Sequence, residues 1–245
     1  MRDLIPVLLD QRRHKVGNGI YDKLQVDFAY NSNHIEGSML THDQTRYIFE
    51  TKSVNGEYAK VDDIFETINH FRCFDYILDT YARDLTDEYI KELHRILKTG
   101  TISSESAEAV VGDYKKYRNA VGDLETTEPD QVPEAMRDLI GNYAPHDLMD
   151  IICFHVDLES IHPFYDGNGR VGRLIMFKEC LRLNILPFII LDRDKYWYSL
   201  GLKEWQTEGK DRRLIETIRL MQDEMEAVFD YFEINKPWRG EGQKS

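Results

Sequence analysis

A polar, glycine-rich insert between two apolar helical segments is the feature that most restricts how this 245-residue chain can fold. The insert, Ile161–Arg173, reads IHPFYDGNGRVGR and holds a histidine, a carboxylate, an amide, three glycines and two arginines. Apolar residues follow helical spacing before it, from Leu148 to Ile161, and after it, from Leu174 to Leu183. The sequence therefore predicts two core helices joined by a tight polar loop.

The rest of the chain is also mostly helical in its pattern. Apolar positions at helical spacing run through residues 61–78 and 214–232, and a further helix is expected to begin after the N-cap Thr86 and to stop at Gly100. No repeat, low-complexity tract or long Pro/Gly/Ser linker divides the sequence. We therefore expect an all-α fold that forms a single domain, residues 1–245.

Two segments depart from the helical pattern. Residues 112–123, GDYKKYRNAVGD, form a short mixed run bounded by glycines, which predicts a β-hairpin. Residues 188–192, FIILD, also break the helical spacing. The expected architecture is a helical bundle with a small β flap.

The formal net charge of −13 argues against nucleic acid or an anionic membrane as a partner, because both require positive charge to neutralise phosphates. The longest apolar run, residues 185–191, is far shorter than the roughly 20 residues that a membrane helix needs. The N-terminus shows no signal-peptide pattern, and Cys73, Cys153 and Cys180 lack paired spacing. A cytoplasmic protein with reduced core thiols is expected.

One alternative for the insert is a dinucleotide site. Residues 167–172, GNGRVG, match the pattern G-x-G-x-x-G, and Asp192 lies twenty positions beyond Gly172. That fingerprint, however, requires a buried strand leading into the first glycine, whereas a polar helix end with Pro163 precedes it here. The sequence therefore disfavours a dinucleotide-binding fold.

A phosphate site between two helices suits the insert better. The first helix would end near His162, closed by Pro163, and the second would start at about Gly169, so that glycine N–H groups and a helix N-terminus face one concavity. Arg170 and Arg173, three positions apart, are expected to project to the same side. Two guanidinium groups above an anion site indicate a ligand with several phosphates.

The other polar residues of the insert suit the chemistry of a nucleotide. Asp166 can bind Mg²⁺, which favours one or two carboxylates together with substrate phosphates, and Asn168 can hold a phosphate oxygen. His162 can accept the proton of an incoming hydroxyl, since an ordinary imidazole titrates near neutrality. The residues alone thus indicate transfer of part of a nucleotide to a hydroxyl.

The segment HPFYDGNGRVGR, His162–Arg173, resembles the signature of the Fic family, H-x-F-x-[DE]-G-N-G-R-x-x-R, at every specified position. The resemblance extends over about residues 31–205 and implies the all-helical Fic fold. It also implies AMPylation, in which AMP from ATP is attached to a Tyr, Thr or Ser hydroxyl of a target protein and pyrophosphate leaves. The remaining C-terminal residues carry no diagnostic pattern.

The resemblance implies a role for each residue of the motif. His162 would be the catalytic base, Asp166 the Mg²⁺ ligand, and Phe164 the anchor of the loop in the core. The α-phosphate would lie against the loop, and the two arginines would hold the distal phosphates. The motif residues of the expected ATP site are then Asp166, Gly167, Asn168, Gly169, Arg170, Val171, Gly172 and Arg173.

A second segment, SNHIEG, Ser32–Gly37, resembles the inhibitory motif of the same family, [ST]-x-x-x-E-[GN]. In autoinhibited members the glutamate, here Glu36, pairs with the second arginine of the signature, here Arg173, and prevents productive seating of the ATP γ-phosphate. Ser32 would be the first specified position of this motif. The alternative is an ordinary helix start with an N-capping serine.

Two further parts of the ATP site are implied by the resemblance. The predicted hairpin lies where Fic proteins carry a flap that pairs with the target segment by strand addition, which places Asn119, Ala120 and Val121 nearest the nucleotide. The segment KYWYSL, residues 195–200, would place Tyr196 and Trp197 beside adenine. The alternatives are a plain surface hairpin and ordinary aromatic core packing.

The sequence thus predicts an autoinhibited protein adenylyltransferase that uses ATP and Mg²⁺ and modifies a target docked on the flap, or itself. Removal of AMP, transfer of another phosphate group by the same fold, and a non-catalytic ATP-sensing module remain alternatives. Retention of His162 argues against the last, because binding alone needs no base. His155 is expected to be structural, and the acidic face at residues 223–226 to be solvated, with a homodimer contact as the alternative.

Overall fold

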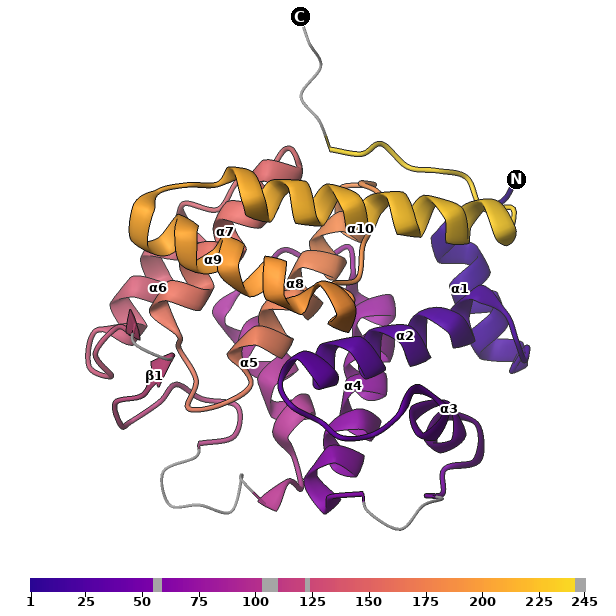
Figure 1. Cartoon of the computed structure of the whole chain (residues 1–245), viewed down its shortest axis with the longest axis horizontal. Helices are drawn as coiled ribbons and strands as arrows, with labels where there is room; N and C mark the ends of the chain where they lie inside the picture. The colour runs from indigo at the N-terminus through magenta and orange to yellow at the C-terminus, as the bar shows by residue number, and fades with distance from the viewer. Residues whose placement is uncertain (55–58, 103–109, 122–123, 241–245) are drawn as a thin grey trace, which may run out of the picture.

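A computed structural model describes residues 1–54, 59–102, 110–121 and 124–240, and nearly all of its regular structure is helical (Figure 1). The N-terminal half contains five helices among these residues: α1 (Leu4–His14), α2 (Ile20–Ile35), α3 (His42–Thr51), α4 (Val61–Thr80) and α5 (Asp87–Lys98). The C-terminal half contains β1 (Ala120–Val121), β2 (Leu124–Glu125), α6 (Val132–Gly141), α7 (Leu148–Ile161), α8 (Asn168–Arg182), the 3₁₀ turn η2 (Asp192–Asp194), α9 (Lys195–Glu208) and α10 (Arg212–Tyr231).

Helix α8 is the centre of the fold. Of its 15 residues, 13 are buried, and it packs against α2, α4, α5 and α7. Figure 1 shows it inside the bundle, with α9 and α10 running across one side. A helix buried on every side has no solvent-facing stripe, so the residues at its N-terminus are held by their surroundings rather than by the helix alone.

The helix boundaries follow from caps that the sequence contains. Thr86 accepts a hydrogen bond from the backbone N–H of Tyr89 at 3.2 Å and starts α5, as predicted. Asp147 and Asp150 form a capping box at the start of α7, which ends at Ile161 where the sequence predicted. Because a capped start and a proline or left-handed residue at the end are local signals, such boundaries can be predicted well.

The predicted hairpin over residues 112–123 is wrong in its bounds. The two short strands pair antiparallel at Ala120↔Glu125 and Val121↔Leu124, while residues 112–119 form turns and irregular structure. This preceding segment is not free to pair because the backbone N–H of Lys115 donates to the carbonyl oxygen of Pro163 at 2.9 Å. Gly122 and Asp123, which the prediction included, lie outside the described residues.

The C-terminal residues beyond α9 close the bundle. Helix α10 packs along α9, and the chain after it forms single parallel bridges from Ile234 to Arg2 and from Trp238 to Ile185. Residues 188–190, which broke the helical pattern, are buried without forming a strand, and the three cysteines are free thiols. Within the described ranges, no helix has both the length and the apolar character that crossing a membrane requires.

Candidate active site

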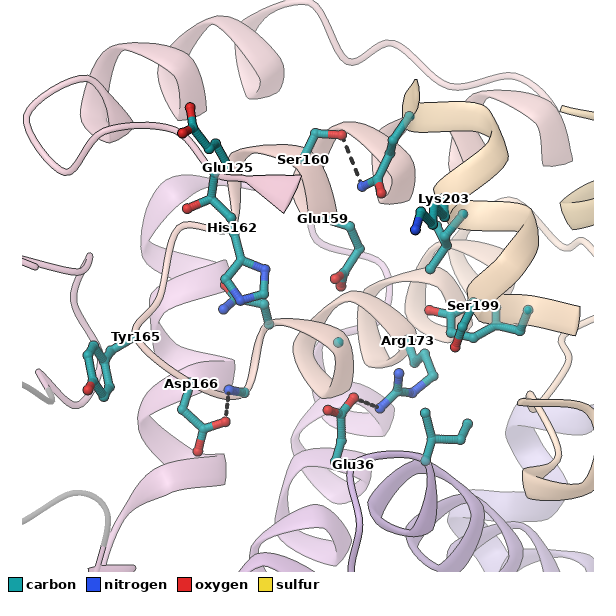
Figure 2. A pocket seen from close by; sticks show the side chains of 18 residues that line it. Glu36, Glu125, Glu159, Ser160, His162, Tyr165, Asp166, Arg173, Ser199 and Lys203 are labelled. Carbon is teal, nitrogen blue, oxygen red and sulfur yellow. Dashed lines mark hydrogen bonds and ion pairs between the residues drawn. The ribbon is translucent and has the colours of Figure 1, made fainter. Parts of the chain in front are cut away.

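His162 lies at the corner between α7 and the loop that leads into α8. Its backbone has φ 51° and ψ 62°, in the left-handed region, and its N–H donates to the carbonyl oxygen of Leu158 at 2.9 Å. A left-handed residue is a common way to end a helix, but it is uncommon for a residue other than glycine. This turn directs the imidazole into a cavity above the N-terminus of α8 (Figure 2).

The environment of His162 keeps its imidazole neutral. Burial lowers the pKa of His162 to about 4, and the positive charge of the nearby Lys115 acts in the same direction. At neutral pH the ring is therefore deprotonated and can accept a proton. This is the protonation state that a general base requires.

The loop between α7 and α8 is locked by side chains that point into it. Phe164 is fully buried and stacks on His94 with ring centroids 3.9 Å apart. The Asn168 amide accepts from the backbone N–H of Phe164 at 2.8 Å and donates to its carbonyl oxygen at 2.9 Å. Asn119 donates to the same carbonyl oxygen at 2.9 Å. Asn168 and Asn119 thus shape the loop with their side chains, although both were expected to lie against the nucleotide.

Each glycine of the motif occupies its position for a different structural reason. Gly167 (φ 87°) is the N-cap of α8, and together with Asn168 and Gly169 it lines the cavity. A Cβ atom on Gly169 would collide with the Glu36 carboxylate, so glycine is required for their close approach. A Cβ atom on Gly172 would lie 2.6 Å from Nδ1 of His155, which makes Gly172 a packing position between α7 and α8.

The cavity has a volume of about 540 Å³, and α9 forms one of its walls. Figure 2 shows Ser199 and Lys203 of this helix opposite His162. Tyr196 and Trp197, which were expected beside adenine, are 65% and 48% exposed and lie outside the cavity. Because each residue turns a helix by about 100°, the cavity face falls on later positions of α9. These are Tyr198, Ser199, Leu202, Lys203 and Gln206.

Arg173 is bound by Ser32 and Glu36, the two ends of the polar pattern in the segment SNHIEG. Its Nε donates to the Ser32 hydroxyl at 3.0 Å, and its Nη2 donates to Oε1 of Glu36 at 2.6 Å. Burial disfavours the charged carboxylate, but Arg173 and Arg170 outweigh this effect, so the pKa of Glu36 lies below its ordinary value. Ser32 lies inside α2 near its C-terminal end, so the alternative of an N-capping serine at a helix start is wrong.

Arg170 does not share the cavity with Arg173, contrary to the expectation from their spacing. It is 2% exposed and forms ion pairs with Glu66 of α4 and, at 3.2 Å, with Asp166. Lys98 of α5 donates to both of these carboxylates, at 2.5 Å to Glu66 and at 2.6 Å to Asp166. Four charged side chains therefore meet below the loop, and only Asp166 and Arg170 among them belong to the motif.

Two more residues at the site, Glu159 and His94, had no sequence signal that singled them out. Glu159 lines the cavity between His162 and Arg173 (Figure 2), and burial together with the charge of Glu36 raises its pKa to about 7. Its Oε1 has no hydrogen-bond partner among the described residues. His94 accepts from the backbone N–H of Gly112 at 3.0 Å, and its other ring nitrogen lies 3.1 Å from the carbonyl oxygen of Asp166. No local pattern distinguishes Glu159 or His94 from the other polar residues of α7 and α5.

The other predicted positions have simpler surroundings. Val171 is fully buried in the core, and the side chains of Ala120 and Val121 lie outside the described residues. His155 is buried, with Nε2 2.6 Å from the Tyr198 hydroxyl, which fits the expected structural role. The acidic face of α10 at residues 223–226 pairs with Arg193, Lys236 and Arg239.

The residues at the loop fit a magnesium–nucleotide complex. Asp166 is half-exposed on the cavity wall, and although burial opposes ionisation, Arg170 and Lys98 lower its pKa to about 2. No cluster of three metal-binding side chains occurs among the described residues. One ionised carboxylate beside an anion site matches the preference of Mg²⁺ for few protein ligands plus substrate phosphates. The first backbone N–H groups of α8, which have no acceptor within the helix, suit the phosphates themselves.

Sequence comparison finds relatives of this chain. Residues 84–180, from just before α5 to the last turn of α8, match the Fic/DOC family. The chain is 30% identical over 214 residues to "Protein adenylyltransferase Fic" of Drosophila melanogaster, which covers 83% of this chain and 41% of the relative. It is 28% identical over 184 residues to the protein of the same name from Nematostella vectensis, covering 69% and 40%. The chain thus spans about two fifths of the length of the curated relatives that it matches.

Solved structures share the fold at lower identity. A Fic-domain-containing signaling protein from Bacteroides thetaiotaomicron superposes with a TM-score of 0.73 at 22% identity, covering 92% of this chain and 94% of that one. Fic-1 (residues 134–508) from C. elegans gives a TM-score of 0.74 at 18% identity, covering 94% and 72%. The helical arrangement around α8 is therefore the same in both.

Proposed function

The chain belongs to the Fic/DOC family, and we propose from that premise that it is a protein adenylyltransferase, which transfers AMP from ATP to a hydroxyl group. The observation that carries the proposal is the neutral imidazole of His162, which faces the cavity beside the N-terminus of α8. A base and an anion site in one cavity are the two groups that attack on a phosphate needs. A module that only binds ATP would need the anion site but no base.

The proposed reaction assigns each step to a group of this chain. The hydroxyl oxygen attacks the α-phosphorus while its proton passes to His162, the bond from the α-phosphorus to the bridging oxygen breaks, and pyrophosphate leaves. The loop at residues 167–169 holds the α-phosphate, with the backbone N–H groups at the start of α8 as donors, and Arg173 holds the distal phosphates. Asp166 would hold Mg²⁺, which supplies charge neutralisation on the phosphates and the leaving group.

The β-hairpin is the proposed docking edge for the target. Glu125 of β2 and Thr126 line the cavity, so a segment added to this edge would reach the base. The hydroxyl would come from a target protein or from a second copy of this chain, and a homodimer would favour such self-modification. A cytoplasmic location is part of the same proposal.

We propose that the resting state is autoinhibited. Glu36 occupies the Arg173 guanidinium that the distal phosphates would otherwise bind, and Arg173 is only 3% exposed. ATP can then enter, but its distal phosphates have to seat elsewhere. Misplacement of the reacting atoms by about 1 Å is enough to cost on the order of 100-fold in rate.

Labelled ATP tests the proposed reaction. The Glu36→Gly protein, in which the proposed inhibition is absent, is incubated with Mg²⁺ and either α-³²P- or γ-³²P-labelled ATP, alone and with a cell extract. Label on protein from the α-position only is expected. Label from the γ-position would show phosphoryl transfer instead, and ATP binding without any label would favour the ATP-sensing module. Loss of AMP from a previously labelled protein, without a rise in labelling, would favour the AMP-removing alternative.

Replacing Asp166 by alanine should weaken Mg²⁺-dependent nucleotide binding and also lower turnover by about 100-fold. Both effects are expected because a bound metal ion contributes several kcal/mol of charge stabilisation. Titration calorimetry with and without Mg²⁺, beside the transfer rate, measures both effects. Asp157→Ala is the matched control, since Asp157 is an exposed carboxylate of α7 outside this cavity. Unaltered magnesium dependence in Asp166→Ala would place the metal on another ligand.

A further inference from the structure

The carboxylate proposed to hold the metal is already occupied by a cation of the protein. The Lys98 ammonium donates to Oδ2 of Asp166 at 2.6 Å, while Oδ1 accepts from the backbone N–H of Gly167 at 2.7 Å and from Arg170 at 3.2 Å. The Lys98 side chain is 4% exposed, whereas that of Asp166 is 46% exposed. Asp166 can thus be reached from the cavity, but a buried charge binds it from behind.

Lys98 is held in this position from two directions. Its ammonium also donates to Oε1 of Glu66 at 2.5 Å. Its aliphatic stem passes under the loop between α7 and α8, where a Cβ atom on Gly167 would lie 3.5 Å from Cδ of Lys98. Glu66 in turn pairs with Arg170, which pairs with Asp166. The four side chains close a ring of alternating charge, and two cations and two anions give this ring no net charge.

A neutral ring is a poor site for a divalent cation, because the charge that would attract the metal is already compensated. We propose that Lys98 is a positioning residue that competes with Mg²⁺ for Asp166 and so sets how strongly nucleotide binding depends on the metal. The inference rests on the proposed function, in that it takes Asp166 as the metal ligand. In this arrangement the ammonium group contributes part of the positive charge near the phosphates when Mg²⁺ is scarce.

The size of the effect follows from charge repulsion. Like unit charges about 4 Å apart repel measurably even at the dielectric constant of water, and the repulsion doubles when one ion is divalent. Salt and the partial exposure of Asp166 reduce it. Removal of the ammonium should therefore strengthen the coupling between Mg²⁺ and nucleotide by about tenfold.

The test measures binding and needs no turnover. The ligand is α,β-methylene ATP, in which the bond that AMP transfer breaks cannot be cleaved, and calorimetry gives its Kd in EDTA and in saturating Mg²⁺. The ratio of the two Kd values is the metal–nucleotide coupling. In Lys98→Met, which keeps the length of the stem, we expect a weaker Kd in EDTA and a ratio about tenfold larger than in the unaltered protein. In Lys98→Arg, which keeps the charge, the ratio should stay within about twofold.

A second variant guards against loss of the fold. Lys98→Met leaves Glu66 and Asp166 with one cation fewer, so Lys98→Met/Glu66→Gln restores a neutral set while Asp166 still lacks the ammonium, and its ratio should also rise. Thermal unfolding followed by circular dichroism shows that each variant is folded.

Asp166→Asn separates the two ways in which the idea can fail. A ratio in the unaltered protein no larger than in Asp166→Asn would mean that Asp166 holds no metal, which overturns the metal site of the proposed function as well as this inference. A ratio that falls in Asp166→Asn but is the same in Lys98→Met, in the double variant and in the unaltered protein would overturn the role of Lys98 alone.

Discussion

Replacing His162 by alanine should lower AMP transfer by about 10²- to 10⁴-fold, which is the usual contribution of a general base. The imidazole is neutral in its partly buried position and faces the cavity, so its removal takes away the proposed proton acceptor for the attacking hydroxyl. ATP should still bind, because the N-terminus of α8 is unchanged. Initial rates of labelling from α-³²P-ATP, together with calorimetric ATP binding, measure both parts of this expectation.

The control for this variant is His146→Ala. His146 is exposed in the loop before α7 and does not line the cavity, so its removal should leave the transfer rate unchanged. If His162→Ala transferred AMP as fast as the unaltered protein, the base would have to be another group, and Glu159 on the same wall would be the first to examine.

Replacing Glu36 by glycine should raise AMP transfer by on the order of 100-fold, because Arg173 then becomes available to seat the distal phosphates. The backbone should tolerate the change, since Glu36 is the C-cap of α2 and its chain then turns at Gly37 with φ 94°. Some stability should be lost, because the buried Arg173 keeps its contacts to Ser32 but loses its carboxylate partner. Transfer rate and melting temperature measured on the same preparation give the two effects.

Two contrasting variants show whether the released arginine is the cause. Glu36→Gln keeps the size of the side chain but removes its charge, so transfer should rise by less than in the glycine variant. Arg173→Ala also abolishes the ion pair, yet it removes the phosphate ligand, so transfer should not rise. A Glu36→Gly protein no more active than the unaltered one, on itself and on added proteins, would leave the contact between α2 and α8 as a structural ion pair.

The helices around the site could be predicted because their signals are local. Thr86, the capping box at Asp147 and Pro163 act within one helical turn, and helix α7 begins and ends where the apolar spacing placed it. The hairpin was placed several residues too early because its position depends on a distant contact, from Lys115 to Pro163. A glycine-bounded run cannot reveal which of its residues are held by another segment.

Some site residues could likewise be predicted from local signals, and others depend on contacts between distant segments. The motif and its resemblance to the Fic family pointed to His162, Asp166 and Arg173, all of which border one cavity. Spacing along a helix could not show that Arg170 turns away to Glu66, nor that α9 presents Ser199 and Lys203 rather than its exposed aromatic pair. These outcomes depend on which side of each helix meets a neighbour.

The sequence by itself determined that this chain is helical, that a glycine-rich loop beginning at His162 joins two core helices, and to which family the chain belongs. The residues of each helix cap lie close together in the sequence, and so do the residues of the motif. Their geometry therefore follows from local chain stereochemistry. Only the tertiary structure decided how the charges are shared: Glu36 with Arg173, 137 positions apart, and Lys98 with Asp166, 68 positions apart. Ion pairs between separate helices form where packing of the apolar core brings those helices together, and no local pattern encodes that contact.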